Sequence, residues 1–253
     1  MAEHVERFTG RVDEYERYRL RYPKAVIDLL RERCGLRPEQ VVADVGAGTG
    51  MLAELFLSQG NTVIAVEPNA AMRAVCDELR KRYARLTVVA AAAESTTLGP
   101  ASVDFVSVGR AFHWFDRERA LAEFRRILKP RGWLTLVSSG RNSDGSEQSK
   151  AYEEILLRWG KDYGEVQRGY RVYEEVPALF ESGSVVKEKI EGEQTLTLEE
   201  LVGQTQSLSV APLPGEAGFE AMQTALQEFF ARYEQEGIVR MGTACWVMAC
   251  LPA

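Results

Sequence analysis

The stretch Val42-Ala43-Asp44-Val45-Gly46-Ala47-Gly48-Thr49-Gly50 places three glycines within five positions, directly behind a run of apolar residues. The apolar run is typical of a buried strand, and a helical pattern, MLAELFLSQG at 51–60, follows the glycines. Glycine tolerates positive φ and lets the backbone approach a ligand closely, because no Cβ intervenes. The order of strand, glycine loop and helix therefore predicts a ligand site at this loop.

The same alternation of elements continues to about residue 140. Short apolar, β-branched runs that suit strands buried on both faces lie at 41–45, 62–66, 86–90, 103–108 and 133–138. Helical patterns lie between them at 51–60, 69–84 and 116–132, the last ending at Pro130 and Gly132. This alternation predicts an α/β fold with a doubly wound, mainly parallel sheet, in which ligands bind beyond the carboxyl ends of the strands.

Composition and charge exclude several classes of protein. Hydrophobic residues make up 45% and charged residues 27% of the 253 positions, so neither disorder nor a fibrous repeat is indicated. With 37 acidic against 31 basic residues the chain offers little basic surface, and we expect no nucleic-acid partner. The charged start MAEHVERFTG lacks the core of a secretion signal, and no apolar run approaches the ~18 residues of a membrane span. We therefore expect a cytoplasmic protein without a membrane partner.

Cysteine and histidine usage argues against a metal centre. The four cysteines lie far apart without CxxC spacing, which fits buried, reduced thiols. Histidine occurs only as His4 and His113, so a histidine-rich metal site is excluded. We expect no metal, although a site built from carboxylates stays open.

An acidic residue indicates that the ligand is a nucleoside. Glu67 stands 21 residues past Gly46, at the end of the second expected strand, where a carboxylate can accept hydrogen bonds from both ribose hydroxyls. In the alternative interpretation, the glycines form a tight turn and Glu67 caps the helix that follows Pro68. The dinucleotide pattern GxGxxG is not met, because Met51 occupies its last position and Asp44 precedes the loop, and this disfavours NAD.

The chain resembles the class I S-adenosylmethionine-dependent methyltransferases, whose first motif, DxGxGxG, reads Asp44 to Gly50 here. The resemblance continues in VEPNAAM (66–72), AAAES (91–95), VDFVSVGRAFHWFD (103–116) and FRRILKPRGWLTLV (124–137). Within this class the chain is similar to the small-molecule, type 11-like branch that carries AFHWFD, which includes trans-aconitate methyltransferase-like proteins. The matching opening segment has Phe8, Tyr15, Tyr18-Arg19 and Tyr22-Pro23, with Leu20 where the branch has proline.

The resemblance implies a Rossmann-like fold of seven strands with an antiparallel last strand and a helical cap. It implies a single methyltransferase domain over 1–253. Its parts would be a cofactor-binding core with N-terminal cap helices (1–140), substrate lid insertions (141–242) and the last strand (243–253). Strand-like segments at 184–192 and 243–251 would be the sixth and seventh strands. The lid helices would lie near 151–160 and 172–182, after Thr197, and at 218–237.

The resemblance also implies the cofactor, S-adenosyl-L-methionine, with S-adenosyl-L-homocysteine as its product. Gly46 and Gly48 would face the methionine part, Glu67 would hold the ribose, and Glu94 would meet the adenine amino group. The other matched positions beside the cofactor are Tyr15, Arg19, Asp44, Ala47, Gly50, Pro68, Met72, Ala93 and Arg110. Taken from the residues alone, Glu94 is a solvated loop acid, Met72 is core, and Tyr15 and Arg19 fit a charged amphipathic helix equally well.

The expected function is in-line transfer of a methyl group to a small organic molecule, which depends mainly on aligning nucleophile, carbon and sulfur. A hydroxyl acceptor needs a general base, whereas a carboxylate or free amine needs none. His113 is the candidate base, and a role in the pocket wall is its alternative. Aromatic and basic residues of the lid are candidates to contact the acceptor, namely Trp159, Tyr163, Arg168, Tyr170, Arg171 and Tyr173. A cofactor-binding regulatory or scaffold protein without turnover is the second hypothesis.

Overall fold

The computed structural model describes residues 9–143, 145–169 and 172–252. Within them, seven strands form one sheet in the order β3-β2-β1-β4-β5-β7-β6. The strands are β1 Val41–Val45, β2 Thr62–Val66, β3 Leu86–Val89, β4 Val103–Gly109, β5 Leu128–Arg141, β6 Ser182–Leu196 and β7 Val239–Pro252. Strands β1 to β5 pair in parallel, and β7 runs antiparallel between β5 and β6. The predicted Rossmann-like sheet with its antiparallel last strand is therefore confirmed.

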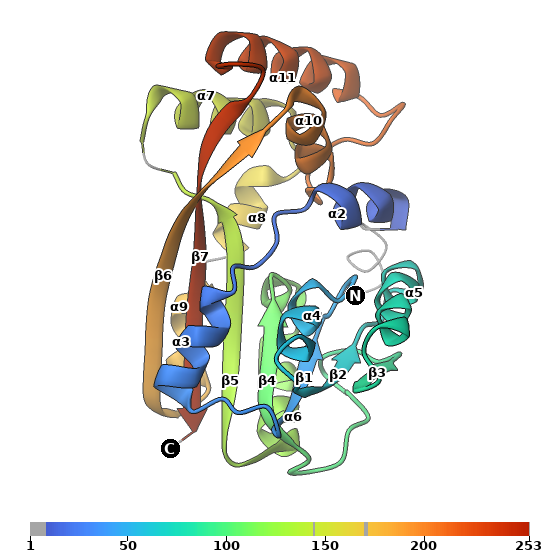
Figure 1. Cartoon of the computed structure of the whole chain (residues 1–253), viewed down its shortest axis with the longest axis vertical. Coiled ribbons are helices and arrows are strands. Elements are labelled where there is room, and N and C mark those ends of the chain that lie inside the picture. Colours follow the sequence, from blue (N-terminus) through green and yellow to red (C-terminus); the bar gives the residue numbers. More distant parts are fainter. Residues whose placement is uncertain (1–8, 144, 170–171, 253) are drawn as a thin grey trace.

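Helices cover both faces of the sheet and its upper end (Figure 1). In the described ranges they are η1 Thr9–Arg11, α2 Val12–Tyr18, α3 Ala25–Cys34, α4 Met51–Leu57, α5 Ala70–Glu78, η2 Leu79–Lys81, η3 Phe112–Trp114, α6 Arg117–Ile127, α7 Glu147–Trp159, α8 Tyr163–Gly169, α9 Val172–Leu179, α10 Leu198–Gln206 and α11 Phe219–Tyr233. Helices α3, α4 and α5 pack on one face, and α6 and α9 pack on the other. None of these helices is long and apolar enough to span a bilayer.

The continuous apolar runs are explained by this double cover. Successive side chains of a strand point to opposite faces, so Val42 joins the hydrophobic cluster on the α4 side and Ala43 the cluster on the α6 side. Both side chains are fully buried. A strand buried on both faces is apolar at most positions, which is the pattern that predicted these strands; Asp44 is the exception in β1.

The cap above the sheet has a hydrophobic cluster of its own. Helices α7, α10 and α11 and the far ends of β6 and β7 enclose it with Leu156, Leu201, Met222 and Val239 among its members. The far ends of β5, β6 and β7 pair with one another up to this cluster, so the three strands are longer than the sequence predicted. The cap is thus an extension of the sheet edge, covered by its own helices (Figure 1).

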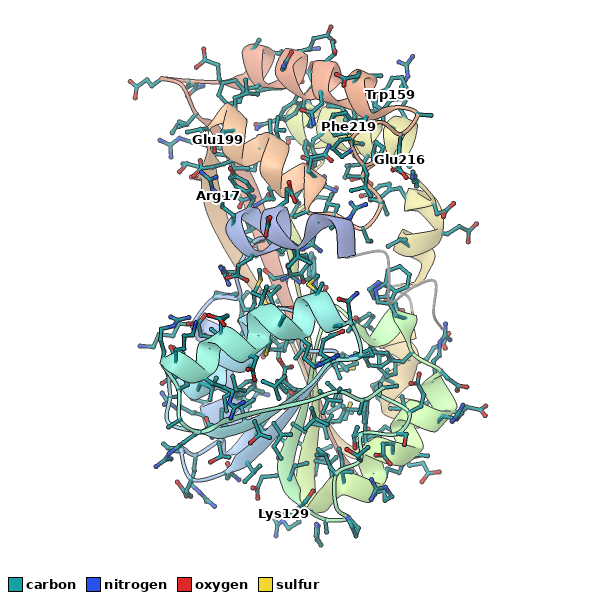
Figure 2. The ribbon with its side chains drawn as sticks, turned by 90° about the vertical axis from the view of Figure 1, so that its right-hand side faces the viewer. Arg17, Lys129, Trp159, Glu199, Glu216 and Phe219 are labelled. Carbon is teal, nitrogen blue, oxygen red and sulfur yellow. The ribbon has the colours of Figure 1, made fainter. Side chains whose placement is uncertain are left out.

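Helix α2 belongs to the cap, although it precedes the core in the sequence. The guanidinium of Arg11, which is buried, donates to the carbonyl oxygens of Gln206, Leu208 and Ala211, at and after the end of α10. Figure 2 shows Arg17 of α2 beside Glu199 of α10, with which it forms an ion pair at 3.0 Å. A cation at a helix carboxyl end also interacts favourably with the helix dipole. Helices η1 and α2 are therefore attached to α10 and to the residues that follow it.

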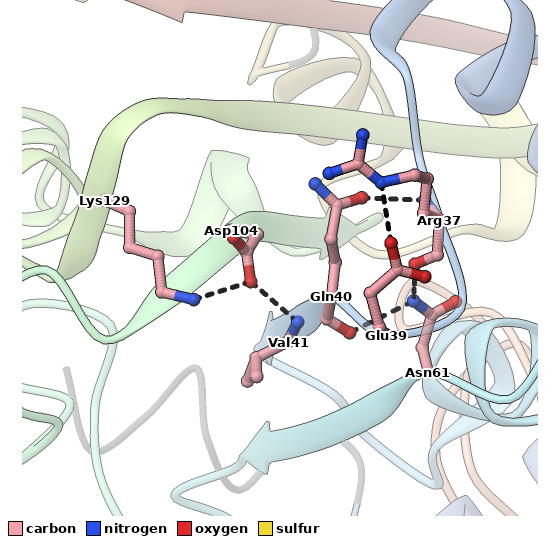
Figure 3. Close-up of polar contacts among 7 residues, drawn as sticks. All are labelled: Arg37, Glu39, Gln40, Val41, Asn61, Asp104 and Lys129. Carbon is pink, nitrogen blue, oxygen red and sulfur yellow. Dashed lines mark hydrogen bonds and ion pairs between the residues drawn. The ribbon is translucent and has the colours of Figure 1, made fainter.

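The opposite end of the sheet is held by polar contacts around the start of β1 (Figure 3). Asp104 accepts hydrogen bonds from the Val41 amide and the Lys129 ammonium, both at 2.9 Å. Asn61 donates to the carbonyl oxygens of Arg37 and Gln40. These contacts tie β1, β4 and β5 together at their amino ends, so the carboxyl ends are left to form a site.

One predicted boundary is wrong. The helix expected over 116–132 ends at Ile127, and Pro130 and Gly132 belong to β5, which begins at Leu128. The pairing of β4 with β5 shifts register next to this segment. Proline fits such an irregularity, because its missing N–H interrupts a regular ladder. Helix α8 has no counterpart among the predicted helices.

Candidate cofactor and acceptor site

The three glycines of the loop after β1 are needed for different reasons. Gly46, Gly48 and Gly50 all have positive φ, at 69°, 58° and 88°. A Cβ on Gly46 would lie 2.6 Å from the Ala111 side chain, and one on Gly50 would lie 2.6 Å from the Leu79 side chain. A Cβ on Gly48 would meet nothing within 4 Å. Packing thus requires two of the glycines, while Gly48 presents bare backbone to open space.

Glu67 connects this loop to the start of α5. Its carboxylate accepts hydrogen bonds from the amides of Gly48 and Asn69, both at 2.8 Å, and the residue is buried. The cap of α5 is Asn69, whose side chain accepts from the Met72 amide at 2.9 Å. Burial raises the pKa of Glu67, and the two amides oppose that rise. A carboxylate has about four acceptor positions, so this one retains lone pairs for two hydroxyl donors.

Asp44, at the carboxyl end of β1, is a buried acid without compensation. The residue is fully buried, and neither carboxylate oxygen makes a hydrogen bond of ordinary geometry among the described residues. Burial raises its pKa to about 7; the nearby amide of Ala53 lowers it, and the charge of Glu67 raises it further. A buried unpaired carboxylate is unfavourable, so this position suits a cationic donor such as an ammonium group.

Arg110 follows β4 and fastens the N-terminal segment to the sheet. It has a positive φ of 55°, which is uncommon for a residue with a side chain. Its guanidinium donates to the Tyr22 hydroxyl at 3.0 Å, to the Leu20 carbonyl at 3.1 Å and to the Ser139 carbonyl at 3.3 Å. Burial raises the pKa of Tyr22, and Arg110 opposes that rise. This unusual backbone therefore aims a positive charge into the site.

Tyr15 and Arg19 bring α2 to the same place. The Arg19 guanidinium lies 5.3 Å from the centre of the Tyr15 ring, and Arg110 approaches that ring from 6.0 Å. The charged amphipathic helix expected here is present as α2, and its Tyr15 faces the glycine loop across a small cavity. The helical interpretation and a position beside the cofactor therefore do not exclude each other.

That small cavity has a volume of about 10 Å³. Its walls are Tyr15, Tyr22, Asp44, Gly46, Ala47, Met51, Leu52, Gly109 and Arg110. The polar groups suit the methionine part of a nucleoside cofactor, but the space is too small for it. Tyr15 forms part of the wall of this cavity, and α2 contacts both the core, through Tyr15, and the cap, through Arg17 and Tyr18.

The remaining predicted cofactor positions lie near the carboxyl edge of the sheet, on loops and in the first turn of α5. Met72 and Ala93 are buried, and Pro68 is exposed. Glu94 is half-buried and accepts a hydrogen bond at 2.8 Å from the amide of Asp116, the N-cap of α6. Glu94 is thus more than a solvated acid, because it joins the loop after β3 to the loop after β4.

The AFHWFD segment forms η3 and an aromatic cluster. Phe115 contacts Phe112 and Phe124 edge-on, with ring centres 6.0 and 6.4 Å apart. His113 is half-buried and lies against Trp114 at 4.4 Å. His113 is not among the described residues that line either cavity of the site. Phe112 and Phe115 mainly anchor this turn to the core, and the role of His113 as base or pocket wall stays a prediction.

A second, much larger cavity of about 1060 Å³ lies between the sheet and the cap. Its lining includes Arg19, Arg110, Leu136, Arg141, Tyr152, Glu153, Tyr163, Tyr173, Lys187, Lys189, Trp246 and Met248. Of the predicted acceptor residues, Tyr163 and Tyr173 line it, whereas Trp159 does not. The side chains of Arg168, Tyr170 and Arg171 lie outside the described part of the chain. Arg110 borders both this cavity and the small one.

A charged cluster in this wall was missed by the sequence analysis. Arg141 donates to the Glu153 carboxylate and the Tyr163 hydroxyl, both at 3.0 Å, and lies 4.4 Å from the centre of the Tyr152 ring. These residues come from the end of β5, from α7 and from the start of α8. The only signal was an arginine just past an expected strand, which is too common to indicate a site.

A mainly parallel sheet whose first strand ends in a glycine loop, with one carboxylate near the end of β1 and one directly after β2, is typical of nucleoside-binding α/β proteins. Residues 43–136 match the family model of the methyltransferase domain. The chain is 32% identical over 204 residues to an uncharacterised methyltransferase of Mycobacterium bovis, covering 80% of this chain and 76% of that protein. The chain therefore belongs to the methyltransferase family, and its sheet has the class I order that the motifs predicted.

Further similarities extend to other organisms and to solved structures. An uncharacterised methyltransferase-like protein of Schizosaccharomyces pombe is 33% identical over 165 residues, covering 64% of this chain and 63% of that protein. The structure of a putative type II methyltransferase from Anaeromyxobacter dehalogenans superposes with a TM-score of 0.67 at 25% identity, covering 93% of this chain and all of the other. Phosphoethanolamine N-methyltransferase 2 from Haemonchus contortus shares the fold, with a TM-score of 0.60 at 16% identity over 99% of this chain and 59% of that one.

Proposed function

We propose that this methyltransferase transfers a methyl group in line from S-adenosyl-L-methionine to a small organic molecule bound in the large cavity. The observation that carries this proposal is the position of Arg110, which borders both the small cavity at the glycine loop and the large cavity under the cap. A cofactor on the loop and an acceptor under the cap would therefore meet at one point. Alignment of two reactants in this way supplies ~7–11 kcal/mol of barrier reduction.

The polar groups around the loop support this choice of cofactor. Glu67 would accept the ribose hydroxyls, Asp44 would receive the amino group of the methionine part, and Gly48 would leave room for its chain. The Haemonchus contortus N-methyltransferase structure is a complex with S-adenosylhomocysteine, the product of the same cofactor. When bound, the cofactor supplies a methyl group on a positively charged sulfur. The residues of the chain hold, orient and shield the reactants.

The large cavity favours an anionic acceptor. Arg110 lines the cavity where it borders the small one, Arg19 also lines it, and no histidine is among the described lining residues. A carboxylate acceptor needs no general base, and two guanidinium groups attract it while they repel an ammonium acceptor. Trp246 and Met248, which also line the cavity, would contact an apolar body. We therefore expect a carboxylate attached to an apolar or aromatic skeleton.

The volume of the cavity favours catalysis over the second hypothesis, a protein that binds the cofactor without turnover. A protein that only binds the cofactor has no need of an acceptor chamber, and about 1060 Å³ lies beside the loop here. Ligand cavities for small molecules have volumes of ~300–1,000 Å³. Catalytic turnover therefore accounts for the geometry better than a silent scaffold does.

Calorimetry with S-adenosylhomocysteine tests the cofactor assignment. Glu67→Ala is expected to weaken binding by about 1.5–3 kcal/mol, because it removes charge-assisted hydrogen bonds. Glu39→Ala is the matched control, since Glu39 pairs with Arg37 at the far end of the sheet and should leave binding unchanged. Equal affinity of Glu67→Ala and the parent protein would overturn the ribose assignment, and tight binding of NADH would overturn the cofactor.

A methyl-transfer screen then tests the acceptor. Carboxylates, amines and alcohols of similar apolar size are incubated with labelled S-adenosyl-L-methionine, and base-labile methyl esters are separated from stable products. We expect methyl esters from the carboxylates. Turnover of amines alone would contradict the proposed acceptor class while leaving the methyltransferase assignment intact.

A further inference from the structure

The free edge of the sheet is unusually long. β6 spans 15 residues, is the last strand in the sheet order, and pairs only with β7 among the described strands. In Figure 1 it forms the left-hand edge of the molecule, with no further strand beside it. Such an edge presents unpaired backbone N–H and C=O groups, which a second strand can bind.

The charges along this edge are ordered by sign. Lys187, Lys189, Glu191 and Glu193 occupy alternate positions of β6 and are all exposed. Alternate residues of a strand lie on one face, so this face carries two positive charges followed by two negative ones. Among the described residues Lys187 forms no ion pair, whereas Lys189 pairs with Glu191 at 2.6 Å and Glu193 pairs with Arg240 at 3.3 Å within the same chain, so the second copy would have to exchange these pairs for its own.

We propose that β6 pairs antiparallel with β6 of a second copy of this chain about a two-fold axis at Ile190. In this register Lys187 faces Glu193 of the second copy and Lys189 faces its Glu191, so symmetry creates four opposite-charge contacts. If the axis lay one residue earlier, Lys189 would face Lys189 of the second copy. If it lay one residue later, Glu191 would face Glu191 of the second copy. Like charges directly opposite each other destabilise a strand pair. The charge order is therefore self-complementary in one register.

Charged side chains on an edge strand commonly keep copies apart. Protection of that kind needs only one sign, as in a row of lysines, because equal charges repel in every register. The face of β6 that carries Lys187, Lys189, Glu191 and Glu193 instead has two charges of each sign, in an order that is complementary to its own reverse. Half-buried Ile190 would meet its own copy at the centre, where it adds apolar contact. This order favours association over protection.

The pairing would also affect the large cavity. Lys187 and Lys189 line it, so the second copy would border its outer rim and neutralise these two ammonium groups. The guanidinium groups of Arg19 and Arg110 would keep their charge. The inference does not depend on the proposed acceptor, because it rests on the edge alone.

Sedimentation velocity at several protein concentrations tests the pairing. The parent protein is expected to dimerise, and Lys187→Glu should raise the dimer dissociation constant by about tenfold or more, because it places Glu opposite Glu twice. The double variant Lys187→Glu/Glu193→Lys restores opposite charges and should recover the dimer. Lys150→Glu, an equal charge change at an exposed site on α7, is the control and should have no effect.

Cysteine cross-linking tests the register directly. Ile190→Cys should form a disulfide-linked dimer on mild oxidation, because position 190 faces itself, while Val185→Cys should not, because it faces Thr195. The four native cysteines are buried and do not compete. A monomeric parent protein, a dimer unaffected by Lys187→Glu, or cross-linking at 185 instead of 190 would each overturn the proposal.

Discussion

The cofactor core and the cap of this methyltransferase are held together in different ways. The core around the glycine loop depends on short stretches of sequence, such as residues 44–50, in which each backbone position has its own steric requirement. The cap depends on contacts between distant segments, such as the Arg11 guanidinium on the carbonyl oxygens after α10. The core also contains an uncompensated charge at Asp44, whereas Arg141 in the cap wall is paired with Glu153. The comparison indicates that local steric requirements organise the core, whereas contacts between distant segments organise the cap.

The largest expected effect concerns the charge in the core. The pKa of Asp44 is raised from 3.8 to about 7, so the folded state binds this proton more tightly than the unfolded chain does. The free energy of unfolding should therefore fall as pH rises from about 4 to about 7. A rise of about three pKa units corresponds to about 4 kcal/mol. Asp44→Asn should remove this loss. In urea unfolding, the free energy of unfolding of the variant relative to that of the parent protein should be higher at pH 8 than at pH 5.

Glu39→Gln serves as the control for that comparison, since Glu39 is an exposed acid at the far end of the sheet. Parallel pH profiles for Asp44→Asn and the parent protein would mean that Asp44 is compensated in solution. In that case the contrast between an unpaired Asp44 in the core and a paired Arg141 in the cap would not hold.

A second experiment tests whether the core loop is sterically determined. Gly46→Ala should destabilise the fold by about 3 kcal/mol, because a positive φ costs ~1–2 kcal/mol with a side chain and the added Cβ overlaps Ala111. Gly215 has a φ of 84°, but an added Cβ there would meet nothing within 4 Å. Gly215→Ala should therefore show only the smaller cost of the backbone conformation. Chemical denaturation measures both. Equal losses in the two variants would show that packing around Gly46 is soft.

The corresponding experiment in the cap uses Gly203, where α2 packs on α10. A Cβ at Gly203 would lie 2.3 Å from the Tyr18 ring, so Gly203→Ala should destabilise by about 1–3 kcal/mol. In a Tyr18→Ala background the overlap is gone, and the same change should stabilise α10 by up to ~1 kcal/mol through helix propensity. Thermal unfolding of the parent protein, the two single variants and the double variant gives the sign of the stability change caused by Gly203→Ala in each background. The same sign in both backgrounds would contradict the packing of α2 on α10.

The smallest effect is expected at the surface of that same contact. Arg17 and Glu199 form an ion pair at 3.0 Å, but their side chains are 70% and 67% exposed. Arg17→Ala should therefore cost only about 0–0.5 kcal/mol. A loss above ~1 kcal/mol in chemical denaturation would mean that this pair, rather than Tyr18 and Arg11, holds α2 to the cap.

Local patterns predicted the core well and the cap poorly. The strands and the glycine loop follow from apolar runs and from residues 44–50, because burial and backbone strain act within a few positions. The end of α6 was placed wrongly, since the choice between helix and strand at Pro130 depends on pairing with β4. The cluster of Arg141, Glu153 and Tyr163 was missed because three separate elements contribute to it. His113 stood out as the one histidine past the N-terminus, yet it lines neither cavity of the described site.

The sequence by itself determined the Rossmann-like fold, the family and the positions of Asp44, Gly48 and Glu67 at the carboxyl edge of the sheet. These follow from periodicity and from steric limits that only glycine meets. The tertiary structure alone decided that α2 joins the cap, that β5 to β7 extend into it, and that Arg110 lies where two cavities meet. The reason is that such contacts join residues far apart in the chain, and their energies depend on packing that no local pattern encodes.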